Sequence, residues 1–148
     1  MKLRKVKPED AAAVAELCAQ LGYPTSEEDI RTRLDALGGR PDHRLIGAEL
    51  DGKLVGWAHV HADWALDHGL EADLLGLVVH EEQRGLGIGR SLIGEAAEWA
   101  FKHHCTRMRV RTNVIRLRAG DFYRRAGFKE IKRQLVLDLP LAGTDANS

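Results

Sequence analysis

The chain has 148 residues, of which 44% are apolar and 30% charged, and its 22 basic residues balance its 22 acidic residues. A chain of this size predicts one folded domain, since two halves would each bury too little surface to be stable. No apolar run approaches the roughly 20 residues that span a bilayer, no apolar stretch follows the basic N-terminus as in a secretory signal, and a zero net charge gives no overall attraction to nucleic acid. Composition therefore predicts a cytoplasmic globular protein with neither a membrane nor a nucleic acid as its partner.

The first third of the chain predicts one strand and two helices. Residues 2–6 have the composition of a short strand, and a helix with apolar residues at helical spacing begins at Pro8. A second helix begins at Thr25 and Glu28, which form a capping-box pattern, and it ends near Gly38.

Strands follow in the middle of the chain. The segments 45–50 and 54–61 flank Asp51-Gly52, a dipeptide that accommodates positive backbone angles and so predicts a tight hairpin. The run 74–79 is apolar without alternation, as expected of a central strand that is covered on both faces.

The rest of the chain predicts a helix with apolar positions from Leu92 to Phe101, a strand around 108–112, a short helix over 117–126 and strands over about 128–139. The whole order indicates an α/β fold (α+β with a mixed sheet), with helices on both faces of the sheet. The domain is predicted to span residues 1–139. A flexible C-terminal tail is predicted over residues 140–148.

Glycines alternate in Arg84-Gly85-Leu86-Gly87-Ile88-Gly89-Arg90, between the predicted central strand and the helix that follows it. The N–H groups of such a turn can converge on an anion at the helix N-terminus, where the helix dipole favours negative charge. No Lys-Ser or Lys-Thr follows the glycines, and the third glycine of the dinucleotide fingerprint is missing. The turn therefore predicts a pyrophosphate-containing ligand other than ATP or NAD, with a tight turn that binds nothing as the alternative.

This turn resembles the pyrophosphate loop of the GNAT superfamily of N-acetyltransferases, Gln/Arg-x-x-Gly-x-Gly/Ala, which stands here as Arg84 to Gly89. A second segment, Ala-Gly-Asp-Phe-Tyr-Arg-Arg-Ala-Gly-Phe from Ala119 to Phe128, is similar to the Ala-x-x-Phe-Tyr-x-x-x-Gly-Phe signature of that family. The resemblance covers about residues 1–139. It implies a GNAT-like fold, in which two neighbouring parallel strands splay apart around acetyl-CoA.

The resemblance also implies how the co-substrate acetyl-CoA binds. The strand before the loop would pair with the pantetheine arm through its backbone, the loop would hold the pyrophosphate, and a residue after the other splayed strand would contact the arm from the far side. The cofactor-binding residues expected on this basis are Leu77, Val78, Val79, Arg84, Gly85, Leu86, Gly87, Ile88, Gly89, Arg90 and Asn113. No metal cofactor is expected.

Tyr123 occupies the tyrosine position of the family and, with an ordinary pKa of about 10, can hold a proton for the departing CoA thiolate. The alternative is that its ring only packs the helix. Many relatives carry an acidic residue near the end of the central strand, where this chain has Leu75 and Gly76. The candidate bases are therefore Glu71 and Asp73, acting directly or through water, although both would also suit a solvated strand start.

His59 and His61 lie on one face of their predicted strand. No third ligand at metal-binding spacing accompanies them, so the pair is interpreted as lining an acceptor pocket or as a structural feature. Tyr23, between the first two helices, and Trp64, before the central strand, are the other acceptor contacts expected.

The sequence thus predicts an N-acetyltransferase that transfers an acetyl group to a primary amine of a small molecule, such as an aminoglycoside-like compound, a polyamine or an amino acid. Three alternatives stay open: a protein or peptide N-acetyltransferase, a CoA-binding sensor without turnover, and a nucleic-acid-binding role for the basic stretch 107–133. Family members are often dimers, so a homodimer is also expected from the resemblance.

Overall fold

The computed structural model describes residues 1–142. The strands are β1 (Lys2–Lys5), β2 (His43–Leu50), β3 (Lys53–Ala65), β4 (Gly69–Val79) and β5 (Met108–Val110). The helices are α1 (Ala11–Leu21), α2 (Glu27–Leu37), α3 (Ile88–Lys102) and α4 (Leu117–Arg125), with short 3-10 turns at η1 (Pro8–Asp10) and η2 (Glu81–Gln83).

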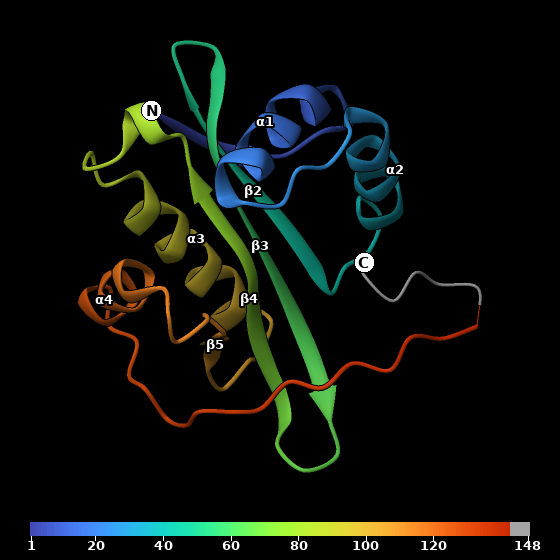
Figure 1. Ribbon diagram of the computed structural model, residues 1–148, viewed down its shortest axis with the longest axis vertical. Coiled ribbons are helices and arrows are strands. Elements are labelled where there is room, and N and C mark those ends of the chain that lie inside the picture. The colour runs from blue at the N-terminus through green and yellow to red at the C-terminus, as the bar shows by residue number, and fades with distance from the viewer. Residues whose placement is uncertain (143–148) are drawn as a thin grey trace.

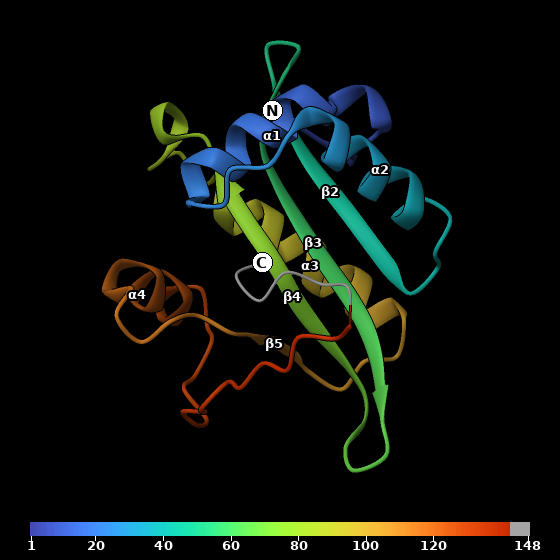
Figure 2. The same ribbon diagram turned by 45° about the vertical axis from the view of Figure 1, so that its right-hand side comes forward.

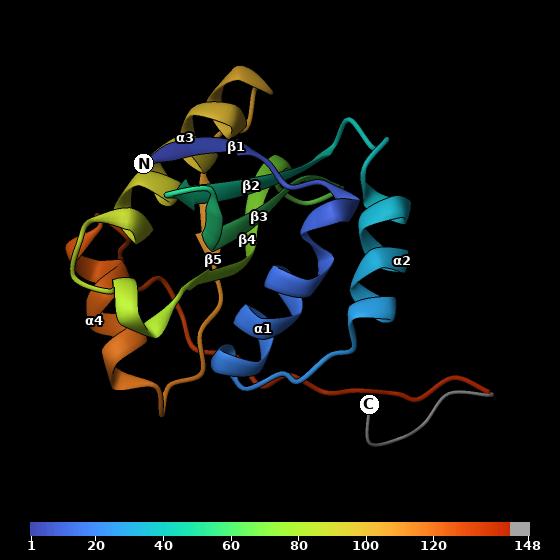
Figure 3. The same ribbon diagram turned by 90° about the horizontal axis from the view of Figure 1, so that it is seen from above.

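The strands form one mixed sheet in the order β1-β2-β3-β4-β5. Strands β1 to β4 pair antiparallel, whereas β4 and β5 pair parallel. Helices α1 and α2 cover one face of the sheet and α3 the other (Figures 1 and 3), and α4 lies beside α3. This arrangement confirms the predicted mixed sheet with helices on both faces.

Local sequence signals explain most of the element boundaries. The tight hairpin between β2 and β3 turns at Asp51 and Gly52, whose φ angles of 52° and 79° are the positive values that this dipeptide accommodates. Helix α2 is capped by the Ser26 side chain, which accepts a hydrogen bond from the Asp29 N–H at 3.0 Å. The capping box predicted from Thr25 therefore lies one residue too early.

The central strand β4 packs against a core on each face, as its unbroken apolar run predicts, with Leu75 as an exposed exception. Leu74 belongs to the core under α3, and Val78 to the core under α1 and α2; each side chain is 4% exposed. The α3 core also contains Leu92, which is fully buried, and the opposite core contains Leu17. Because these contacts fix both faces of β4, the position of its backbone is set by packing.

Strands β4 and β5 separate after a short parallel ladder. Only Ala72 to Leu74 of β4 have partners in β5, at Met108 to Val110. On its other side β4 pairs with β3 along its length, with an irregularity at which Leu75 is left out of the register and is 52% exposed. From Leu75 to Val79 the β5 side of β4 therefore has no strand partner, which is the splay that the GNAT-like resemblance implies (Figure 1).

The strands predicted over 128–139 are not found: residues 128–142 form neither helix nor strand. The segment leaves α4 and crosses the lower ends of β3 and β4 on the side of α1 and α2 (Figures 1, 2 and 3) without joining the sheet. The prediction failed because alternation of apolar residues makes a strand only where a neighbouring strand supplies hydrogen bonds. Of the tail predicted over 140–148, residues 143–148 lie outside the described residues.

No helix within residues 1–142 combines the length and the apolar character that a membrane crossing needs.

Candidate functional site

The glycine loop between β4 and α3 presents unpaired backbone N–H groups. Gly85 and Gly87 have φ angles of 83° and 82°, and a Cβ on either would meet nothing within 4 Å, so backbone conformation rather than space requires glycine. Within the described chain, none of the N–H groups from Gly85 to Gly89 donates a hydrogen bond. They stand at the N-terminus of α3, where the helix dipole also favours an anion. These groups fit a pyrophosphate.

The residues that lead into this loop are hydrogen-bonded to neighbouring elements. The Gln20 side-chain oxygen, on α1, accepts from the Glu81 N–H at 2.9 Å, and the His80 N–H donates to the Val55 carbonyl at 2.7 Å. The Arg84 Nε folds back to donate to the Val79 carbonyl at 3.3 Å. The loop is thus anchored to α1, β3 and β4 before the glycines begin, which makes its conformation part of the fold.

Helix α4 packs directly on the start of α3. A Cβ at Gly89 would lie 2.9 Å from the Phe122 ring, so this glycine is needed for close approach of the two helices. The Arg90 Nη2 donates to the Arg125 carbonyl at 2.7 Å, at the C-terminal end of α4. The guanidinium of Arg90 is therefore already bonded to α4, and any contact that it makes with a phosphate competes with this bond.

The free edge of β4 leads into the loop. Leu77 and Val79 pack against the α3 core, whereas Val78 is buried on the side of α1. Side chains on both faces leave the backbone itself at the open edge, where every second residue directs its N–H and C=O outwards. These groups can pair with the amides of an extended ligand.

Tyr123 lies on α4, half-buried against the α3 core. Its ring contacts Phe122 and Phe128 edge-on, with centroids 5.4 and 5.5 Å away. Burial raises the pKa of Tyr123, and the charge of Arg116 opposes this only in part. Because its pKa is raised, the hydroxyl is protonated at neutral pH, and it is free to donate because it makes no hydrogen bond with any described residue.

Glu71, the first candidate base, is 6% exposed and bound by three cationic or basic side chains. His68 Nδ1 lies 3.0 Å from Oε1, Arg109 Nη2 lies 3.2 Å from Oε1, and Arg107 Nε lies 2.9 Å from Oε2. The carboxylate therefore holds β4 against β5 through ion pairs, and this geometry disfavours it as an acceptor of a proton.

Asp73, the second candidate base, has fewer partners within the protein. Its Oδ1 accepts from Arg111 Nη1 at 2.8 Å, and its other oxygen accepts no hydrogen bond from the described chain. Asp73 faces His61 of β3 in the sheet register, beside the point where β4 and β5 separate. Of the two acids, Asp73 is better placed to take up a proton, directly or through water.

Comparisons with known proteins agree with this geometry. The sequence model described as the acetyltransferase (GNAT) family matches residues 11–128. An uncharacterized N-acetyltransferase of Methanocaldococcus jannaschii is 30% identical over 136 residues, which are 89% of this chain and 80% of that protein.

The chain belongs to the GNAT family of acetyltransferases. Its activity class is therefore the transfer of an acetyl group from acetyl-CoA to an amine. Two solved structures share the fold with a TM-score of 0.84 each: an aminoglycoside 6′-N-acetyltransferase from Acinetobacter haemolyticus, 17% identical and covering 95% of this chain and 99% of its own, and an aminoglycoside N-acetyltransferase in complex with CoA, 18% identical and covering 95% of both.

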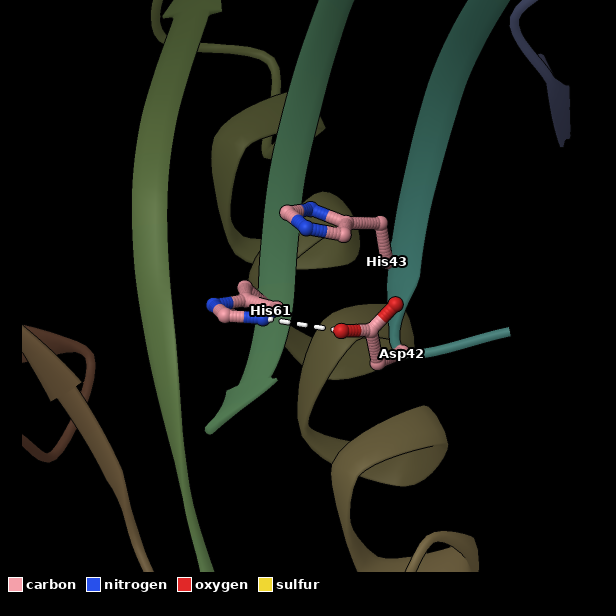
Figure 4. A group of neighbouring side chains, drawn as sticks. All are labelled: Asp42, His43 and His61. Carbon is pink, nitrogen blue, oxygen red and sulfur yellow. Dashed lines mark hydrogen bonds and ion pairs between the residues drawn. The ribbon is translucent and has the colours of Figure 1, made fainter. Parts of the chain in front are cut away.

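The two histidines predicted on β3 of this GNAT acetyltransferase are joined by a third from β2. His43 Nδ1 lies 2.9 Å from His59 Nε2, and the His43 ring stacks on the His61 ring with centroids 4.0 Å apart. His61 Nε2 lies 3.2 Å from Asp42 Oδ2 (Figure 4). Burial, followed by the charges of its two histidine neighbours, lowers the pKa of His59 to about 4, so His59 is neutral at pH 7.

The other predicted acceptor contacts occupy different places. Trp64 is exposed, and together with His61 it lines a hollow of about 430 Å³. Tyr23 is not among the lining residues of that hollow; the Arg116 guanidinium carbon lies 5.9 Å from the centre of its ring, and Arg116 Nη2 donates to the Leu21 carbonyl at 3.4 Å. The structure thus brings Tyr23 to the segment that precedes α4.

Asn113, expected to contact the pantetheine arm, forms a turn before α4. Its side-chain oxygen accepts from the Ile115 N–H at 3.2 Å, and its carbonyl accepts from the Arg116 N–H at 2.9 Å. A contact between Asn113 and the arm stays a prediction.

Several residues of this region were missed from the sequence. The basic stretch 107–133 left open a nucleic-acid-binding role, but Arg109 in β5 and its neighbours Arg107 and Arg111 bind the acids of β4. Their period of two beside an acidic strand was the available signal. Asp42 and His43 had no such signal, because only the pairing of β2 with β3 brings them to His61.

Proposed function

We propose that this GNAT acetyltransferase transfers an acetyl group from acetyl-CoA to a primary amine of a small molecule. The observation that carries the proposal is the convergence of an open strand edge, Leu75 to Val79, with unpaired loop N–H groups, Gly85 to Gly89, at the N-terminus of α3. An extended arm that ends in a pyrophosphate matches both features at once.

When bound, acetyl-CoA supplies the acetyl group as a thioester. On this proposal the backbone edge at Leu77 to Val79 binds the arm and offers an N–H to the carbonyl oxygen as negative charge develops there. Asp73, directly or through water, takes the proton that the amine nitrogen loses on forming its bond to the acetyl carbon. Tyr123 donates its hydroxyl proton to the sulfur as the carbon–sulfur bond breaks.

A compact, cationic acceptor suits the surface around this edge. Asp42 lies just before β2, Asp63 on β3 and Asp73 on β4. Asp73 already pairs with Arg111, and the other two carboxylates can attract protonated amines. The bond from Arg116 to the Leu21 carbonyl ties the C-terminal end of α1 to the segment before α4, which narrows the space for an extended peptide. The shared fold of the aminoglycoside acetyltransferases supports aminoglycosides as the first acceptors to test, beside polyamines and amino acids.

The first experiment is thermal unfolding with acetyl-CoA and CoA, with NAD and ATP as controls. A ligand at 100 times its Kd adds about 2.7 kcal/mol of stability, which raises Tm by about 5–10 °C for a domain of this size. We expect this rise with the two CoA compounds only. No rise at saturating acetyl-CoA would contradict the loop assignment.

The second experiment measures thiol release from acetyl-CoA with aminoglycosides, polyamines, amino acids and short peptides. We expect turnover with a small amine and none with a peptide. Turnover confined to peptides would replace the small-molecule acceptor with a protein acceptor.

A CoA-binding sensor is the second candidate, and the ion pairs of Glu71 favour it because they remove one of the two possible bases. It predicts the same rise in Tm with CoA but no thiol release with any member of the panel.

We also propose that two copies of the chain pair in the cytoplasm. Leu135, Leu137 and Leu139 are each at least 80% exposed on a segment that joins no strand, and a second copy would cover them. Light scattering should report a dimer for the wild type and a monomer for Leu137→Asp. A wild-type monomer at high concentration would contradict the pairing.

A further inference from the structure

A compact group of metal-ligating side chains lies at the start of β2 and the end of β3, outside the CoA loop. Asp42, His43 and His61 each offer one ligand atom, and these atoms all lie within 4.8 Å of one another (Figure 4). The acetyl-transfer chemistry proposed above uses none of the three as an acid or a base.

The backbone of the sheet holds these ligands together. His43 and His61 are direct cross-strand partners, and the Ala62 N–H donates to the Asp42 carbonyl at 2.8 Å. The three side chains therefore share one place on paired strands, and binding a metal would not require a loop to become ordered.

One distance already suits a small divalent ion, and the His61 ring would rotate out of its stack on the His43 ring, whose centroid lies 4.0 Å away, to aim its Nε2 at the same ion. Zinc lies about 2.0–2.1 Å from imidazole nitrogen and about 2.0–2.2 Å from carboxylate oxygen in tetrahedral sites, so two of its ligand atoms stand about 3.3 Å apart. His61 Nε2 and Asp42 Oδ2 are 3.2 Å apart. An ion between them would replace the hydrogen bond that now joins them.

His43 already has the partner that a metal-binding histidine needs. Its Nδ1 is hydrogen-bonded to His59 Nε2 at 2.9 Å, which leaves His43 Nε2 as the ligating atom. Histidines that bind metals almost always hydrogen-bond through their second ring nitrogen, which fixes the ring and the tautomer.

We propose that Asp42, His43 and His61 bind a zinc ion, with His59 as the residue that orients His43. Two imidazoles and one carboxylate favour zinc over magnesium or calcium, which prefer oxygen ligands. Three protein ligands leave a fourth position for water. Asp42 and His61 border the hollow of about 430 Å³, so the ion can enter from solvent.

The test is calorimetric titration of zinc chloride into protein that carries no polyhistidine tag and has been dialysed against a chelator. We expect one equivalent to bind to the wild type. Asp42→Asn and His61→Asn should weaken binding by more than about 100-fold, whereas His59→Gln should weaken it by about 10–100-fold, the usual effect of losing an orienting partner. Zinc should also raise Tm of the wild type but not of His61→Asn.

The matched control is His104→Asn, which removes an exposed imidazole outside the cluster. Asparagine tolerates the positive φ of 66° at this position. This variant should bind zinc as the wild type does.

Absence of one-equivalent binding in the wild type would overturn the proposal. Wild-type affinity in Asp42→Asn would overturn it as well, because that change keeps the size of a half-exposed side chain and should leave the fold intact. Circular dichroism of each variant before the titration separates loss of a ligand from loss of the fold. None of these outcomes depends on whether the chain transfers acetyl groups.

Discussion

The two halves of β4 differ in what surrounds their backbone and side chains. From Gly69 to Leu74 the strand lies between β3 and, at its end, β5, and its acids Glu71 and Asp73 are ion-paired with arginines in and beside β5. From Leu75 to Val79 the strand pairs with β3 alone and carries no charged side chain.

The difference shows how one strand can serve both the fold and a ligand. In the first half, hydrogen-bonding and charged groups are already bound within the protein, so they stabilise the sheet. In the second half, the side chains from Leu77 to Val79 pack on both faces while backbone groups stay open, so these groups can bind a ligand without unfolding anything. Loss of the buried, ion-paired Glu71 should therefore affect stability, whereas changes around the second half, and at Asp73 where the two halves meet, should affect binding and turnover.

The largest effect that we expect concerns Tyr123, beside the open half. Tyr123→Phe should lower kcat by about 100 to 10,000-fold, the usual contribution of a positioned acid, because the sulfur would leave without a proton. The affinity for acetyl-CoA, measured by calorimetry, should not change. Undiminished turnover in Tyr123→Phe would assign the acid to another group.

A matched control makes the reverse change of one hydroxyl group outside the site. Phe101→Tyr changes an exposed ring on α3 by one hydroxyl, outside the site, and its kcat should equal that of the wild type.

The next effect lies in the paired half. Glu71→Gln should lower the free energy of unfolding by about 3–5 kcal/mol, because it leaves the charge of half-buried Arg109 without its partner. Asp73→Asn is the matched change: its partner Arg111 is 54% exposed, so the loss should stay below about 1 kcal/mol. Urea unfolding measures both.

Activity then separates the two acids. We expect Asp73→Asn to lower kcat with little loss of stability. A normal stability and a low kcat in Glu71→Gln would instead make Glu71 the base, and the assignment of Glu71 to the stability of the sheet would fail.

A smaller effect tests the loop at the end of the open half. Gly87→Val forces a branched side chain into a positive φ, at a cost of about 1–3 kcal/mol. If the bound loop needs this conformation, acetyl-CoA binding weakens by about 5–150-fold. Gly94→Ala, at an exposed position inside α3 with nothing within 4 Å of its Cβ, should keep the wild-type affinity. Equal affinity in Gly87→Val would show that the glycine serves only the turn.

Local patterns were enough to predict the parts of this fold that depend on neighbouring residues. The hairpin at Asp51-Gly52, the buried run of β4 and the turn from Gly85 to Gly89 all appear where the sequence places them. Each depends on backbone angles or on burial, which residue type determines over a few positions.

Features that depend on pairing between distant segments were not predictable in the same way. The ion pairs of Glu71 arise because the pairing of β5 with β4 brings Arg109, and Arg107 just before β5, to its carboxylate. The contact of His43 with His61 needs the register of β2 on β3. The apolar alternation after residue 128 predicted strands that lack a neighbour in the described structure. The sequence predicts which face of a strand a residue occupies, but it does not predict which other strand pairs with that strand.

The last prediction concerns an ion pair at the opposite edge of the sheet, which serves as a reference for the paired half of β4. Arg4, on β1, donates from Nη1 and Nη2 to the two oxygens of Asp10 at 2.8 and 2.9 Å. These bonds, which outweigh the opposing effect of burial, lower the pKa of Asp10 below its ordinary value of 3.8.

Because the folded pKa of Asp10 lies below the unfolded one, the stability that this carboxylate contributes is present above about pH 4 and is lost as pH falls through the folded pKa. Asp10→Asn should therefore be less stable than the wild type by about 1.5–3 kcal/mol at pH 7, and the difference should shrink below pH 4, as measured by urea unfolding across pH. Its affinity for acetyl-CoA should not change, since β1 lies three strands from the open edge. If the difference in the free energy of unfolding stays constant down to pH 2, Asp10 acts through its shape rather than its charge. The ion pairs of Glu71 and Asp73 would then need the same pH test before their charge is taken as the cause that joins β4 to β5.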